Sequence, residues 1–90
     1  MKVTIYSRSQ CHLCEVAQQI AEQVQSELAV QGIDFEIEKI LIDNNPDLEE
    51  QYGDLVPVTQ IDGKQHDFFR IDAERLKNSL IGLHQFPLHE

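Results

Sequence analysis

Basic residues are scarce in this sequence. Its 90 residues include only seven lysines and arginines against sixteen aspartates and glutamates, which gives a formal net charge of −9 at pH 7. A surface with this charge repels a polyanion, so we expect no nucleic-acid partner. Eight of the acidic residues lie between Asp34 and Asp54, where Lys39 is the only base, and a solvated face accounts for this cluster.

Long apolar runs are also missing. No segment approaches the roughly 18 consecutive apolar residues of a membrane-spanning helix, so we expect no membrane partner. Polar residues interrupt the N-terminal segment 2–8, which therefore does not resemble a secretory signal. Together these observations favour a cytoplasmic protein. The only two cysteines, Cys11 and Cys14, are then normally reduced, and a purely structural disulfide explains such a pair poorly.

The sequence contains no repeat, low-complexity tract or linker, so we expect a single domain spanning residues 1–90. Residues 2–6 are rich in β-formers and predict a strand. A long helix follows after a polar loop, and Gly32 is its natural stop. The apolar residues of this helix recur at spacings of three and four: Leu13, Val16, Ala17, Ile20, Ala21, Val24 and Leu28.

Residues 35–42 predict a second strand, with Phe35, Ile37 and Leu41 on one face. Acidic residues alternate with the first two of these side chains. A short helix is expected between residues 45 and 53, because an asparagine suited to capping precedes a proline suited to the first turn.

Residues 56–61 and 65–69 predict two further strands, joined by a tight turn at Asp62-Gly63. Asp72 then caps a last helix that Gly82 is expected to close. The order β-α-β-α-β-β-α gives one parallel pair with a right-handed crossover and one antiparallel hairpin. Helices on both faces of this four-stranded mixed sheet predict a three-layer α/β fold.

The segment Cys11-His12-Leu13-Cys14 is a C-x-x-C motif placed directly after a strand and a loop, at the start of a helix. The first turn of a helix has unpaired N–H groups and a partial positive charge. A thiolate at Cys11 is stabilised there, so its pKa is expected below that of a free cysteine, and Arg8 and protonated His12 add to this effect. The thiolate is the attacking species in disulfide exchange.

Cys14 lies one helical turn before Ala17, at the flank of the apolar stripe, and is expected to be less exposed than Cys11. An exposed attacker and a sheltered partner suit an exchange in two steps. Cys11 attacks a substrate disulfide, and Cys14 then resolves the mixed disulfide.

Three alternative roles for the cysteine pair stay open at the level of sequence. In the first, the two side chains are idle, small buried hydrophobes in a noncatalytic adaptor. The second is a structural zinc site completed by His84 and His89. The third is a metal or iron–sulfur cluster held by Cys11 together with a second molecule.

The segment from Tyr6 to Cys14 resembles the active-site segment of glutaredoxins, and the element order is similar over nearly the whole chain. Val56-Pro57-Val58 stands where those proteins have their cis-proline loop. The likeness is greatest to the small bacterial glutaredoxin-like proteins that share a Cys-His-Leu-Cys motif. The resemblance implies a thioredoxin-like, more narrowly glutaredoxin-like, fold.

The resemblance also implies roles for individual residues. Cys11 is the nucleophile and Cys14 the resolving thiol. Pro57 is cis and lies beside Cys11, while Val56 offers its backbone to an extended substrate. Arg8 stands where glutaredoxins often place a lysine near the glutathione carboxylate.

Two departures from the glutaredoxin pattern bear on glutathione. His12 replaces the proline that commonly follows the first cysteine, and Phe69-Arg70-Ile71 replaces a pair of glycines before the last helix. Asp72, the cap of the last helix, is still placed to meet the ammonium group of a ligand such as glutathione. The resemblance therefore implies a monomeric oxidoreductase without bound cofactor. Its expected partners are disulfide-containing proteins or small thiols, and glutathione is expected to bind weakly.

Overall fold

The computed structural model describes residues 1–68 and 70–85. Seven elements follow one another in the order β-α-β-α-β-β-α, as the sequence predicts. They are β1 (Lys2–Ser7), α1 (His12–Ala29), β2 (Glu36–Leu41), α2 (Pro46–Tyr52), β3 (Val58–Ile61), β4 (Lys64–Phe68) and α3 (Ala73–Gln85). No helix within the described ranges is both long and apolar enough to cross a membrane.

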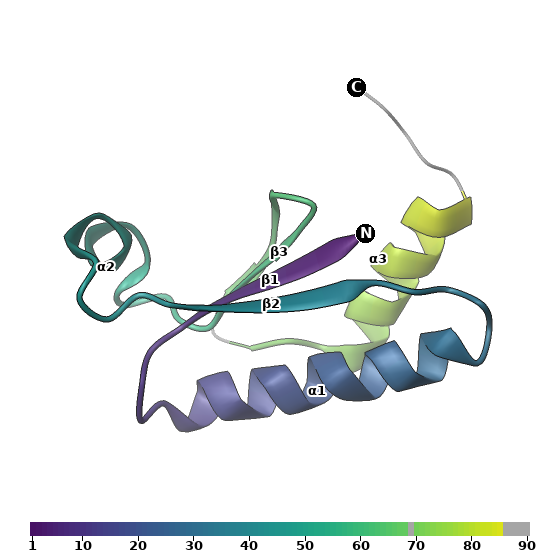
Figure 1. Cartoon of the computed structure of the whole chain (residues 1–90), viewed down its shortest axis with the longest axis horizontal. Coiled ribbons are helices and arrows are strands. Elements are labelled where there is room, and N and C mark those ends of the chain that lie inside the picture. Colours follow the sequence, from purple (N-terminus) through teal and green to yellow (C-terminus); the bar gives the residue numbers. More distant parts are fainter. Residues whose placement is uncertain (69, 86–90) are drawn as a thin grey trace.

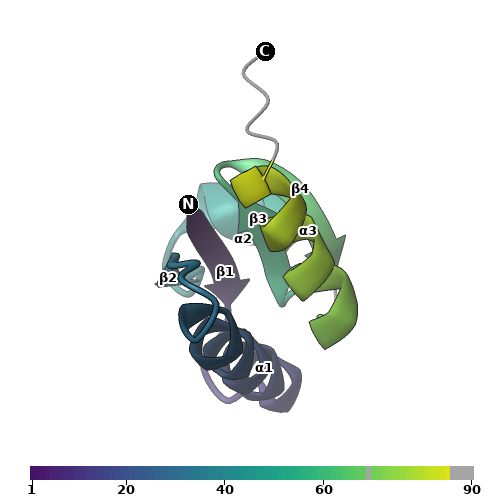
Figure 2. The same ribbon diagram turned by 90° about the vertical axis from the view of Figure 1, so that its right-hand side faces the viewer.

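The four strands form one mixed sheet in the order β2-β1-β3-β4 (Figure 2). β1 pairs in parallel with β2 and antiparallel with β3, which in turn pairs antiparallel with β4. The register places Tyr6 opposite Val58, and Val58 opposite Phe68. The end of β1, the start of β3 and the end of β4 therefore share one end of the sheet, which we call the motif end.

The core lies between one face of the sheet and the helices α1 and α3 (Figure 1). Val3 and Ile5 of β1 are fully buried in it, because alternate strand residues point to the same face. The apolar stripe of α1 packs against them at the expected spacing. Besides these two strand residues, the buried cluster consists of Ala17, Ala21, Val24, Leu28, Ile33, Phe35, Ile61, Ile71, Leu76 and Leu80.

The opposite face of the sheet carries α2. Tyr6 alternates with Ile5 and so points away from the core, and its ring stacks on Tyr52 of α2 with the ring centroids 4.6 Å apart. The side-chain amide of Gln60 donates a hydrogen bond to the Tyr52 hydroxyl at 3.1 Å. In Figure 1, α2 lies at the end of the sheet where α1 begins, so the third layer covers the motif end.

Local sequence signals explain the caps and turns. Oδ1 of Asn45 accepts a hydrogen bond from the Leu48 N–H at 3.2 Å and caps α2, as expected. Asp62 and Gly63 both have positive φ angles (50° and 83°), which suit the tight turn between β3 and β4. Gly32 has a φ of 80° just after α1, in the conformation that ends a helix at low cost in glycine.

Two details of the sequence prediction are wrong. Gly82 does not end the last helix, because α3 continues to Gln85 and Leu83 still packs against the core. Leu41 is 49% exposed and does not face the core, because it is the last residue of an edge strand. Phe69, which the sequence assigns to the fourth strand, and His89 lie outside the described residues.

Candidate active site

The loop between β1 and α1 is fixed before it reaches the first cysteine. Ser9 donates hydrogen bonds from its backbone N–H (3.1 Å) and from its hydroxyl to Oδ2 of Asp43, which follows β2. These bonds, with a smaller contribution from the charge of Arg8, hold the pKa of Asp43 below its ordinary value. Gln10 then adopts a left-handed conformation (φ 56°) that turns the chain into α1.

Cys11 is the N-cap residue of α1, with an extended backbone (φ −112°, ψ 109°). Its Sγ accepts a hydrogen bond from the backbone N–H of Cys14 at 3.2 Å, so sulfur takes the place of the usual capping oxygen. The free N–H groups and the dipole of an 18-residue helix favour negative charge at this atom. The geometry is that of a site which stabilises a thiolate when the protein is reduced.

Cys11 and Cys14 are joined by a disulfide, with their Cα atoms 5.2 Å apart. Cys14 is 1% exposed, whereas Cys11 is partly exposed, which confirms the expected asymmetry of the pair. Cys11 is therefore open to solvent in part, whereas Cys14 lies within the protein.

The proline loop also lies at the motif end. The Val56–Pro57 peptide bond is cis, as the resemblance implies. Pro57 is buried directly before β3, whose first residue, Val58, pairs with Tyr6 near the end of β1. This register brings the proline loop to the same end of the sheet as the loop that leads to Cys11.

The remaining residues expected at the site lie on different sides of it. Arg8 is exposed, and its guanidinium lies against Gly53 at the end of α2. His12 is the exposed first residue of α1. Asp72 caps α3, because its Oδ1 accepts hydrogen bonds at 2.9 and 3.2 Å from N–H groups of the first turn. Arg8 thus adds positive charge on the α2 side, while the Asp72 carboxylate already has partners within the protein.

A groove beside the motif did not follow from the sequence. It has a volume of about 250 Å³ and separates the first turns of α1 from the segment before α3. Leu13 is 46% exposed there, although the helical spacing alone assigns it to the core stripe. The only sequence signal was its place at the start of that stripe, beside the cysteines. The groove is lined by Leu13, Val16, Ala17, Ile20, Arg70 and Ile71.

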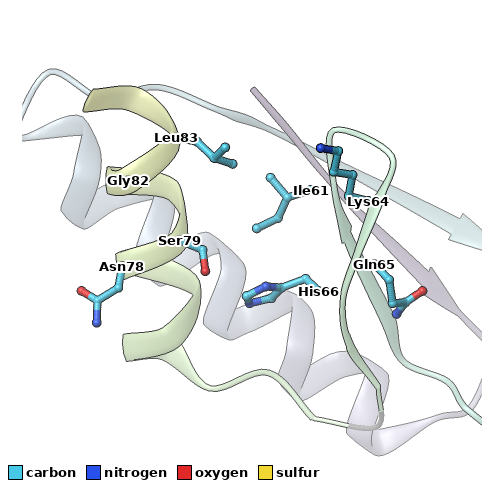
Figure 3. Close-up of a pocket in the computed structure, with 8 residues that line it drawn as sticks. All are labelled: Ile61, Lys64, Gln65, His66, Asn78, Ser79, Gly82 and Leu83. Carbon is cyan, nitrogen blue, oxygen red and sulfur yellow. The ribbon is translucent and has the colours of Figure 1, made fainter. Parts of the chain in front are cut away.

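A larger cavity, of about 400 Å³, lies between the β3–β4 hairpin and α3 (Figure 3). Ile61 and Leu83 face one another across it, and the His66 imidazole points toward Ser79 of α3. Burial lowers the pKa of His66, and its Nε2 atom is buried without a hydrogen-bond partner among the described residues. The other lining residues are Lys64, Gln65, Asn78 and Gly82.

Metal ligands do not gather at either hollow. Within residues 1–68 and 70–85, no group of three or more histidine, cysteine, aspartate or glutamate side chains is arranged to hold a metal ion. His84 is exposed near the end of α3, and its proposed zinc partner His89 lies outside these ranges.

The fold and the cysteine pair together define a thioredoxin-like protein with a disulfide at the start of its first helix. The sequence matches the family described as Glutaredoxin-like domain (DUF836) over residues 2–81. The chain belongs to this glutaredoxin-like family, as the sequence comparison with glutaredoxins implied.

The chain is also similar to relatives of known sequence or structure. The chain is 32% identical over 77 residues to an uncharacterized protein of Mycobacterium tuberculosis, covering 84% of this chain and 78% of that protein. It is also similar to an X-ray structure from X. campestris (30% identity, TM-score 0.67, 89% and 96% of the two chains). An NMR structure from Nitrosomonas europaea matches at 31% identity, with a TM-score of 0.60 and coverage of 87% and 88%.

Thioredoxin 1 from Thermosipho africanus matches 97% of this chain and 98% of its own, with a TM-score of 0.65. At 15% identity, this likeness shows the fold alone.

Proposed function

We propose that this protein is a thiol–disulfide oxidoreductase in which Cys11 attacks and Cys14 resolves. The observation that carries the proposal is the partly exposed sulfur of Cys11 at the N-cap of α1, with Cys14 buried one turn behind it. Membership of the glutaredoxin-like family supports it. The proposed substrates are disulfide-containing proteins or small disulfides, and the proposed compartment is the cytoplasm.

The reaction proceeds in two exchanges. The Cys11 thiolate attacks one sulfur of the substrate disulfide, forms a mixed disulfide and expels the other substrate sulfur as a thiolate. The Cys14 thiol then loses its proton and attacks the Cys11 sulfur, which releases the second substrate thiolate. Two electrons pass to the substrate, and the protein ends with the Cys11–Cys14 disulfide seen in the structure. A thiol reductant restores the dithiol.

The positions of the two sulfurs support this order of attack. The backbone N–H of Cys14 reaches the Cys11 sulfur, and the helix end stabilises charge there. Burial disfavours the charged form of Cys14, so this thiol reacts only with a sulfur that is already adjacent. Glu15, in the first turn, opposes a thiolate at Cys11, but its exposed side chain can turn to solvent.

The test is the reduction of insulin with dithiothreitol as electron source. We expect the wild-type protein to accelerate precipitation of the insulin chains, and Cys11→Ser to remove the acceleration entirely. If the wild-type protein gives no acceleration, the noncatalytic adaptor or the cluster carrier is favoured. Metal analysis of the same reduced, anaerobic sample separates these two, because only the cluster carrier contains bound metal.

A further inference from the structure

The groove beside the motif includes one residue of the C-x-x-C segment, Leu13. Leu13 lies between the two cysteines in the chain, and its 46% exposed side chain forms one end of the groove. Val16 and Ile20 extend the same apolar surface along α1, at spacings of three and four residues. An extended peptide whose cysteine meets Cys11 therefore has apolar surface beside it for a neighbouring side chain.

The far wall of the groove is anchored by burial and hydrogen bonds. Ile71 is 6% exposed and anchors its segment in the core, and the next residue, Asp72, caps α3. The backbone N–H of Arg70 donates a hydrogen bond to the Phe68 carbonyl at 2.6 Å. Arg70 itself is exposed and lines the groove.

The charge of the groove is opposite to that of the molecule. Among the described residues that line it, Arg70 is the only charged one, although the chain as a whole has a net charge of −9. The nearby Asp72 carboxylate is held by the first turn of α3. Glu15 and Glu22 lie together on another flank of α1, with Gln18 and Gln19.

We propose that this groove selects the substrate of the exchange reaction: a polypeptide disulfide with an apolar side chain and a carboxylate close to the reacting cysteine. The apolar side chain packs on Leu13, Val16 and Ile20, and the carboxylate pairs with Arg70. This inference rests on the proposed function, because it concerns the partner of the same Cys11 sulfur.

Two peptide probes test the selection. Each has a Leu-Cys-Leu centre whose cysteine is a mixed disulfide with 2-thiopyridine, and the two differ only in flanking glutamates or lysines. The Cys11 thiolate attacks the peptide sulfur and expels pyridine-2-thione, whose absorbance is followed in a single turnover of prereduced protein. Cys14 then releases the peptide thiol, so no external reductant is needed.

The expected preference between the two peptides is opposite to the one that the overall charge of the protein would produce. A net charge of −9 attracts the lysine peptide, whereas the groove favours the glutamate peptide. We expect the glutamate peptide to react about fivefold faster with the wild-type protein, a factor that one exposed ion pair can supply. Arg70→Glu should reverse the preference, and Arg70→Lys should retain most of it.

Lys64→Glu is the matched control, because it makes the same change in net charge at an exposed position near the opposite end of the sheet. Its ratio of the two peptide rates should equal that of the wild-type protein. Equal rates, a lysine preference in the wild-type protein, or a ratio unaffected by Arg70→Glu would each overturn the groove assignment. If a second copy of this chain covers the groove, the second-order rate constants should fall as the protein concentration rises. This result would also overturn the groove assignment.

A third probe, 2,2′-dipyridyl disulfide, separates this inference from the proposed function because it has no peptide side chains. If it modifies Cys11 and leaves a Cys11–Cys14 disulfide while the two peptides react equally, the exchange function stands and the groove does not select. If none of the three probes releases pyridine-2-thione from the prereduced protein, the exchange function itself fails.

Discussion

The two hollows of this molecule lie toward opposite ends of α3 and differ in size and chemistry. The cavity around His66 has a volume of about 400 Å³, against about 250 Å³ for the groove beside Leu13. None of the described residues that line the larger cavity belongs to the C-x-x-C motif, whereas the smaller groove is lined by Leu13, which lies between the two cysteines in the chain. For exchange chemistry, an accessible sulfur at a helix end matters more than volume, because the reaction needs a stabilised thiolate and not enclosure.

The two ends of the sheet are also secured differently. At the motif end, a side chain from another loop fixes the chain before Cys11, the proposed nucleophile, since Asp43 accepts a hydrogen bond from the Ser9 N–H. At the other end, the Asp62 carboxylate accepts a hydrogen bond from the Lys2 N–H at 2.8 Å and ties the hairpin turn to β1. The first hydrogen bond helps to position the segment that carries the Cys11 sulfur, whereas the second joins the hairpin turn to the start of β1.

The largest expected effect concerns the two sulfurs. Cys14→Ser should accumulate covalent mixed disulfides with substrate, because the resolving thiol is gone, and Cys11→Ser should abolish both trapping and turnover. Brief, limiting iodoacetamide treatment of the reduced wild-type protein should label Cys11 first, since its thiolate is favoured at the helix end. Peptide mapping measures the order of labelling.

The matched control for this experiment is the wild-type protein in its oxidised form, in which both sulfurs are blocked. It should not be labelled. Faster labelling of Cys14, or reductase activity that survives in Cys11→Ser, means that attacker and resolver are assigned the wrong way round.

Glutathione gives the next largest effect. The resemblance implies that Phe69-Arg70-Ile71 stands where glutaredoxins have paired glycines, and residues with side chains at these positions leave less room for close backbone contacts. We expect turnover of a glutathione mixed disulfide to be about tenfold slower than that of a protein disulfide, which corresponds to the loss of one or two hydrogen bonds. Both rates are measured on the same enzyme preparation. Efficient glutathione turnover, or bound glutathione touching Arg8, Val56 and Asp72, contradicts this prediction.

Much of the motif end was predictable because its signals are local. A strand, a polar loop and a helix beginning at Cys11 follow from residue types within one short segment, and so does the greater burial of Cys14. The caps at Asn45 and Asp72 are likewise determined by a single side chain each. By contrast, the cis peptide at Pro57 was expected only from the resemblance, since proline alone rarely adopts it.

Features that depend on distant contacts were missed. The exposure of Leu13 depends on how far the segment before α3 stands from α1, which helical spacing cannot specify. Continuation of α3 past Gly82 depends on packing of Leu83 against the core, and this outweighs the weak preference of glycine for helix ends. The cavity around His66 arises from the spacing of β4 and α3 and had no sequence signal.

A substitution at Gly82 tests whether the larger cavity is separate from the site. A Cβ atom added at this position meets nothing within 4 Å, and the glycine lies inside a helix. Gly82→Ala should therefore stabilise the protein by about 0.5–1 kcal/mol and raise Tm by several degrees. Insulin reduction should be unchanged. A slower reduction rate would connect the cavity with the exchange reaction.

The smallest effect is expected from the titration of His66. Burial, assisted by the positive charge of Arg75 and opposed by Asp67, lowers the pKa of this imidazole from its ordinary value of 6.5. The unfolded chain therefore binds a proton at a higher pH than the folded one. Stability is complete above the unfolded pKa and declines as pH falls through 6.5 toward the lower folded pKa.

His66→Phe removes this titration and keeps an aromatic ring in the cavity. The difference in unfolding free energy between wild-type and variant proteins, measured with urea at several values from about pH 8 to about pH 5, should move against the wild-type protein as pH falls. All other ionisable residues are the same in both proteins, so the difference isolates the contribution of His66. A difference that stays constant with pH shows that water reaches the imidazole equally well in the folded and unfolded chains.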